Sequence, residues 1–158
     1  MSAQHIYDFA PLGSIVRYSD GTPQPPARHT RKRAVWETTN NAGCLIRKQQ
    51  GRRGGVEGFL ATFTLRTGDI ATCGIIVVKV LRTFDVRSRL TFTVVEQALI
   101  GSVRVLSGEG DDRELLNLAE DPAAAERWRE LSGYRQAVLE AVAADELAVE
   151  FVEGRAVA

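Results

Sequence analysis

Apolar and polar residues alternate over most of the first two thirds of the chain, which predicts a β-rich region. These segments are rich in β-branched and aromatic residues and are separated by glycine, aspartate and proline. Residues 70–84 form the longest run and predict a central strand buried on both faces, preceded by a turn at Gly68 and Asp69. The predicted strands are residues 5–9, 13–19, 44–49, 59–66, 70–84, 87–95 and 101–107, and residues 94–101 also fit a helical turn.

A short helix is predicted over residues 27–39, after a proline-rich stretch that blocks regular strand pairing. Pro26 is tolerated in the first helical turn, because the N–H that it lacks has no intrahelical partner there. Asn40, Asn41 and Gly43 adopt left-handed conformations easily and therefore end the helix. One face carries small side chains that suit packing against a sheet: Ala27, Thr30, Ala34 and Thr38.

The last third of the chain predicts helices. Asp111 or Asp112 is a candidate cap for a helix over residues 113–120. Asp121 and Pro122 are a typical start for a second helix over residues 123–146, which Gly133 kinks or divides. Its apolar residues recur every three or four positions and predict a stripe that packs on the sheet: Trp128, Leu131, Tyr134, Val138 and Val142. Residues 146–154 alternate and predict a final strand.

Together these elements predict an α+β fold. We expect a twisted antiparallel sheet or partly open barrel of five to seven strands, one basic N-terminal helix and a C-terminal helical section packed on the sheet. The 158 residues fit one domain, because single cores are built from roughly 100–200 residues. That domain, residues 1–158, divides into a basic β-rich part, 1–106, and an acidic helical part, 107–158.

A net charge of zero conceals a strong division of charge along the chain. Residues 1–104 hold fifteen Lys and Arg against seven Asp and Glu, a net charge of +8, whereas residues 105–158 hold five against thirteen, or −8. A local basic excess attracts polyanions even when the total charge is zero. We therefore expect a nucleic acid, DNA or RNA, as the partner, bound through its backbone.

The basic residues that would grip this backbone fall into two clusters, the predicted helix and a glycine-rich segment downstream of it. Trp36 lies within the basic arc of the helix, where its ring can stack on a base or a sugar. The candidate nucleic-acid-binding residues are Arg28, Arg31, Lys32, Arg33, Trp36, Arg47, Lys48, Arg52 and Arg53. In the alternative interpretation Val35 and Trp36 turn into the core, the arginines only solubilise the helix, and Arg52 and Arg53 mark a charged hairpin tip.

No catalytic motif is evident, so the assignment as an enzyme stays open and the sequence favours a non-catalytic protein. His5 and His29 are the only histidines, and His29 stands among four cations that disfavour its protonated form. Cys44 and Cys73 form no CxxC pair and are expected to be small buried hydrophobes. Helix capping explains the acidic cluster at Asp111 better than metal binding does. No cofactor or metal site is expected.

The first twenty residues do not resemble a signal peptide, and no apolar run approaches the ~20 residues that span a bilayer. We therefore expect a cytoplasmic protein without a membrane partner, and the richness in Ala, Arg and Val favours a bacterial source. Two functions remain. The first is a nucleic-acid-binding accessory or regulatory protein. The second is a protein-binding module, an inhibitor or an assembly factor from a mobile element, that uses its charge division to bind an oppositely charged protein or to form a homo-oligomer.

Overall fold

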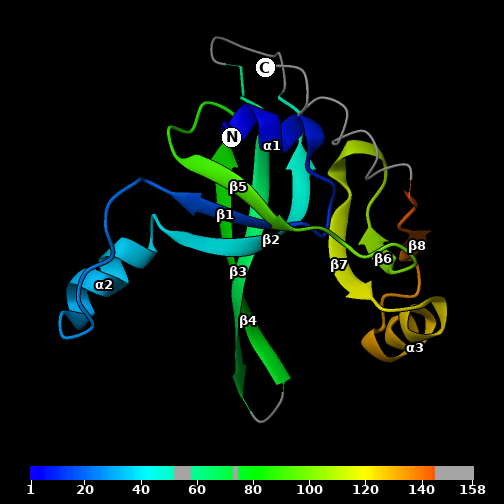
Figure 1. Ribbon diagram of the computed structural model, residues 1–158. Helices are drawn as coiled ribbons and strands as arrows, with labels where there is room; N and C mark the ends of the chain where they lie inside the picture. The colour runs from blue at the N-terminus through cyan, green and yellow to red at the C-terminus, as the bar shows by residue number, and fades with distance from the viewer. Residues whose placement is uncertain (52–57, 73–74, 145–158) are drawn as a thin grey trace.

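A computed structural model describes residues 1–51, 58–72 and 75–144, and it has the predicted α+β architecture (Figure 1). The described residues form eight strands, one more than the upper limit expected from the sequence. The helices are α1 (Ala3–Phe9), α2 (Thr30–Glu37) and α3 (Pro122–Ser132), and a 3₁₀ helix covers Gly110–Asp112. The strands are β1 (Ile15–Ser19), β2 (Asn41–Gln49), β3 (Thr62–Thr72), β4 (Ile75–Asp85), β5 (Thr91–Glu96), β6 (Val103–Ser107), β7 (Glu114–Ala119) and β8 (Val138–Ala141).

The sheet is antiparallel and is organised around β2. Its main path runs β4-β3-β2-β7-β6-β8, and β1 joins β2 to β5 off that path. Cys44 is paired with both β1 and β3, and Arg47 with both β3 and β7. Since a strand has only two edges, β1 and β7 both lie along the edge of β2 that faces away from β3. The sheet therefore forks at the middle of β2.

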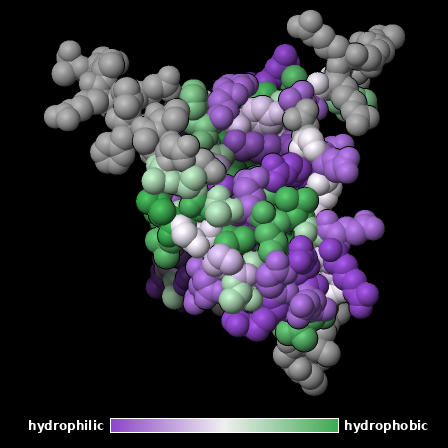
Figure 2. Space-filling model, turned by 90° about the vertical axis from the view of Figure 1, so that its right-hand side faces the viewer, coloured by the Kyte–Doolittle hydropathy of each residue, from purple (hydrophilic) through white to green (hydrophobic). Residues whose placement is uncertain are grey.

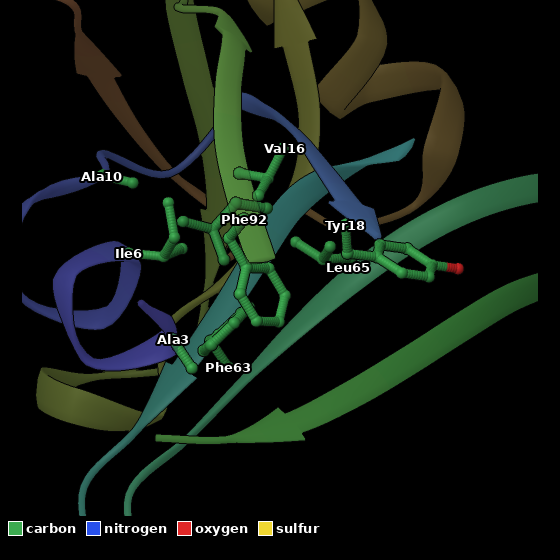
Figure 3. Close-up of a cluster of buried hydrophobic side chains, with 9 residues drawn as sticks. Ala3, Ile6, Ala10, Val16, Tyr18, Phe63, Leu65 and Phe92 are labelled. Carbon is green, nitrogen blue, oxygen red and sulfur yellow. The ribbon is translucent and has the colours of Figure 1, made fainter. Parts of the chain in front are cut away.

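A hydrophobic core under α1 holds one branch of this fork, the strands β5-β1-β2-β3-β4 (Figure 3). The chain over residues 5–9, predicted as a strand, is helical because the hydroxyl oxygen of Ser2 accepts a hydrogen bond from His5 N–H and caps the first turn. The spacing of Ala3, Ile6 and Ala10 then directs one face into the core. Three phenylalanine rings pack beneath it with centroids 5.3–5.6 Å apart: Phe63, Phe84 and Phe92.

The run over residues 70–84 is not one central strand, as the sequence predicted. It ends β3 and forms β4, which lies at an edge of the sheet. The turn expected at Gly68 and Asp69 is also wrong, because β3 continues through both residues and Asp69 pairs with Lys79 across the hairpin. Exposed Val78 and Val80 show that β-branched composition here reflects strand propensity and not burial on both faces.

The C-terminal branch contains fewer helical residues than expected. Residues 113–120 were expected to form a capped helix, but they contain β7. The short apolar run around Leu115 and Leu116, which are both buried, fits a helix or a strand equally well, so the sequence pattern could not distinguish the two. Asp121 caps α3 as predicted, by accepting a hydrogen bond from Ala124 N–H. Gly133, at φ +79°, ends α3 in the left-handed conformation, so Val138 belongs to β8.

The apolar stripe predicted on a long helix is therefore divided between α3 and the segment after it. Trp128 packs on a core formed with β6 and β7, whereas Leu131, Tyr134 and Val138 are exposed. The face on the side of α3 and β8 shows hydrophobic patches among hydrophilic residues (Figure 2). Residues 94–101 contain no helical turn. The predicted final strand, residues 146–154, lies outside the described residues.

A cluster of charges holds β8 against the rest of this branch. The side chain of Arg104, only 4% exposed, donates from Nε to the carbonyl of Leu12 (2.8 Å) and from Nη1 to Glu140 (3.3 Å). Arg113 donates to the other carboxylate oxygen of Glu140 (2.5 Å). Burial by itself raises the pKa of Glu140, but the hydrogen bonds and charges of the two arginines outweigh it and hold that pKa below its ordinary value.

Candidate nucleic-acid interface

The basic helix α2 projects from the sheet as an arm at the side opposite α3 (Figure 1). We call residues 20–40 the arm. Its helix begins at Thr30 and ends at Glu37, and so is shorter at both ends than the predicted residues 27–39. None of its eight residues is buried, and Val35 is 69% exposed. The expectation that its small residues pack against the sheet is therefore wrong.

A polar network at the base of the arm replaces the missing apolar contacts. The carboxylate of Asp20 accepts hydrogen bonds from Thr22 N–H and Oγ1–H (2.9 and 2.6 Å), from Asn40 Nδ2 (2.8 Å) and from Thr39 Oγ1 (2.7 Å). These donors favour the charged form and hold the pKa of Asp20 far below its ordinary value. Asn40 is buried and also donates to the carbonyl of Trp36 at the end of α2 (3.1 Å).

Trp36 fastens the two sides of the arm together. Its indole Nε1–H donates to the carbonyl of Thr22 (2.9 Å), and the side chain is half-buried. The ring therefore turns neither into the main core nor fully toward solvent, so neither of the two interpretations drawn from the sequence describes its contacts fully. Its clearest contact is with the backbone of its own arm.

The arm presents cations with little acidic counter-charge. Arg28, Arg31 and Lys32 are exposed and form no ion pair with any residue that the structure describes, whereas Arg33 pairs with Glu37 (3.2 Å). Arg28 Nε donates to His29 Nε2 (3.2 Å), which holds both side chains at the start of α2. Three cations at the start of the helix therefore face solvent together.

The described part of the second basic cluster, Arg47 and Lys48, does not lie beside the first. Arg47 and Lys48 lie near the far end of β2, roughly 20 Å of strand beyond its first residue, Asn41. Both are half-buried: Arg47 pairs with Glu114 (3.7 Å), and Lys48 lies over the ring of Tyr7, 5.9 Å from its centroid. Arg52 and Arg53 lie outside the described residues. The structure thus gathers Arg28, Arg31, Lys32, Arg33 and Trp36 on the arm and places Arg47 and Lys48 elsewhere.

Of the residues that anchor the arm, only Trp36 is among the candidates selected from the sequence. Asp20 is not among the candidate residues, although an aspartate that accepts a hydrogen bond from the backbone N–H two residues on, as Asp20 does from Thr22, is a familiar local motif. Its pairing with Thr39 and Asn40, about twenty positions later, has no local signal. Only the folded chain brings the two ends of the arm together.

The described residues offer few groups that could form another kind of site. Cys44 is half-buried, and burial raises the pKa of its thiol. Cys73 lies outside the described residues. Within residues 1–51, 58–72 and 75–144, no three histidine, cysteine or carboxylate side chains gather to hold a metal ion, and no helix is long and apolar enough to cross a membrane.

One comparison with known proteins gave a match. The family model described as "Uncharacterised conserved protein UCP036055" matches residues 1–146 of the chain. No curated protein and no solved structure matches the chain.

Proposed function

The chain belongs to the UCP036055 family, and from the geometry of its arm we propose that it is a non-catalytic accessory or regulatory protein that binds the phosphate backbone of a nucleic acid through α2. The observation that carries the proposal is a short helix that buries none of its residues and, with the residues just before it, exposes three cations without ion-pair partners among the described residues: Arg28 before the N-cap, and Arg31 and Lys32 in α2.

The length of α2 supports a role outside the fold itself. Helices shorter than about 12–15 residues are marginal in water unless an apolar face is packed. The eight residues of α2 pack no such face, and its base is held by Asp20, Asn40 and Trp36. An element that adds nothing to the hydrophobic core, yet is anchored by a polar network, is suited to contact a partner.

Charge chemistry favours a polyanion as that partner. Arginine donates to two phosphate oxygens at once, and lysine acts as a compact point charge. Cations grouped on one exposed helix neutralise neighbouring phosphates and read no base sequence. In this proposal Arg28, Arg31, Lys32 and Arg33 contact the backbone, and Trp36 positions the arm.

Fluorescence anisotropy with labelled single- and double-stranded DNA and RNA tests this function. The test variant R28A/R31A/K32A is compared with R87A/R127A/R135A, which removes the same charge from exposed arginines outside the arm. Losing three phosphate contacts should weaken binding of every oligonucleotide by on the order of 10²-fold or more at low salt. The control should retain most of the parental affinity.

Two results would contradict the proposal. The first is that no oligonucleotide binds the parent protein at low salt, with circular dichroism showing it folded. The second is equal loss of affinity in the arm variant and the control, which would reduce the interaction to net charge and remove α2 as a specific surface.

A further inference from the structure

Strand β7 has one edge that is largely unused. Along its length it pairs with β6, from Val103 opposite Ala119 to Ser107 opposite Glu114. On its other side the only strand pairing among the described residues is between Glu114 and Arg47 of β2. Because β1 occupies the earlier part of the same edge of β2, β7 diverges from the fork. Within the described residues, the backbone from Leu115 to Ala119 therefore faces no strand on that side.

A groove runs along this edge. It consists of two adjoining cavities of about 330 and 360 Å³ that share Ile15, Cys44 and Leu118 as walls. The first is lined by four consecutive residues of β7, Leu115 to Leu118, and the second continues from Leu118 to Glu120. Side chains alternate between the faces of a strand, so a lining of consecutive residues marks its edge. The groove thus reaches the edge of β7, where Leu118 is exposed, Asn117 is half-buried, and Leu115, Leu116 and Ala119 are buried.

The walls of the groove are mainly apolar, and its second cavity also carries two acidic residues. Leu118 is 36% exposed within it, and Leu99, which lines the second cavity, is 73% exposed. Cys44 contributes an apolar wall, since burial raises the pKa of its thiol and so favours the neutral form. Glu96 and Glu120 line the second cavity, are exposed and form no ion pair with a described residue. The second cavity therefore combines apolar contact area with uncompensated negative charge.

We propose that this groove binds an extended peptide segment of a partner protein, which adds to the sheet as a strand on the edge of β7. Main-chain hydrogen bonds to residues 115–119 supply affinity, and pockets for alternate side chains supply selectivity. A large apolar side chain of the peptide rests on Ile15, Cys44 and Leu118, and a lysine or arginine lies beside Glu96 and Glu120. This site is separate from the arm and does not depend on nucleic-acid binding.

The experiment begins with a random octapeptide library displayed on phage and selected on the immobilised full chain. Selected peptides are synthesised with fluorescein, both unmodified and N-methylated at alternate residues, and their binding is followed by anisotropy. The variant L118W fills the groove, and L131W is the matched control because Leu131 is exposed on α3. Hydrogen exchange monitored by mass spectrometry then locates the bound peptide.

The expected consensus alternates apolar residues and carries a basic residue near one end. N-methylation of the peptide residues that face β7 and the L118W change should each weaken binding by about tenfold or more, because they remove main-chain bonds or pocket volume. L131W should not weaken it. Amides of residues 114–120 should exchange more slowly in the complex, and E96Q/E120Q should weaken basic peptides by roughly threefold to tenfold at low salt.

Three results would overturn the proposal. They are a library that yields no binding peptide, peptides that bind L118W as tightly as the parent, and binding unchanged in every N-methylated form. Binding of small apolar molecules in the groove without any peptide would likewise identify it as a small-molecule pocket and refute the strand-addition model. Nucleic-acid affinity measured on L118W should equal that of the parent, which keeps the two proposals independently testable.

Discussion

Asp20 shows how one carboxylate positions an arm that has no hydrophobic contact with the sheet. Its oxygens gather donors from both ends of the arm, Thr22 on one side and Thr39 and Asn40 on the other. Because the group is exposed, water competes with these bonds, and we expect it to order the arm more than to stabilise the whole fold. The charge of Asp20 should nevertheless fix the orientation of α2 relative to the sheet.

Replacing Asp20 with Ala should therefore loosen the arm and leave global stability nearly unchanged. Amides of residues 21–40 should exchange about tenfold faster or more, since local opening no longer breaks this network. D8A, which removes an exposed carboxylate on α1, is the control and should leave this exchange unaltered. A large fall in global stability with unchanged exchange in the arm would assign Asp20 to the fold instead.

The same residue sets a pH dependence. The pKa of Asp20 is depressed in the folded chain, so its contribution is complete above its ordinary value of 3.8 and is lost as pH falls toward the folded value. In a W128F background, the fluorescence of Trp36 should therefore stay constant from neutral pH down to about pH 3.8, the ordinary pKa of the group, and change only in stronger acid. A transition near neutral pH would show that another group holds the arm.

At the level of elements, the ion pairs of Glu140, one of the four residues of β8, hold that strand against the rest of its branch. The carboxylate joins Arg104 of β6 to Arg113 just before β7, so three parts of the branch meet at one side chain. Removing its charge leaves the nearly buried Arg104 with less compensation. A charge left without its partner lowers the free energy of unfolding more, the more deeply that charge is buried.

The variant E140Q should lower the free energy of unfolding at pH 7 by about 1–2 kcal/mol, less than for a fully buried pair because Glu140 is partly exposed. The depressed pKa means that this stabilisation is complete above the ordinary value of 4.5 and disappears as pH falls through the folded value. Urea unfolding at several pH values, with the exposed E130Q as control, measures it. A difference that grows in acid would contradict the assignment.

At the level of the whole molecule, the division of charge is not a division into two faces. α3 carries two glutamates and two arginines, and four of the thirteen acidic residues after residue 104 lie outside the described residues. The basic side is also divided, since β2 separates α2 from Arg47 and Lys48. A polyanion can therefore contact one basic cluster or both, and the salt dependence of its affinity distinguishes the two cases.

If only the arm contacts phosphates, affinity should fall by on the order of 10²-fold between 50 and 200 mM salt, as expected for three or four contacts. If Arg47, Lys48, Arg52 and Arg53 join, six to eight contacts should make the fall about 10³-fold or more. Anisotropy titrations of a 20-nucleotide probe against salt distinguish these slopes. Salt-independent affinity would exclude backbone binding altogether. Salt-sensitive oligomers in sedimentation without such binding would favour self-association.

Local sequence determined the features that depend on neighbouring residues. The α+β class, β2, the N-cap of α3 at Asp121 and the solvent-facing basic residues of α2 all follow from periodicity, propensity and charge. The structure alone decided that residues 5–9 form a helix, that residues 113–120 contain β7 and that residues 70–84 belong to a hairpin at the edge of the sheet. These outcomes depend on which distant segment covers each apolar face. The anchoring of the arm, its separation from Arg47 and the groove beside β7 likewise arise from the fork in β2, because pairing between residues far apart in the chain leaves no periodic signal along it.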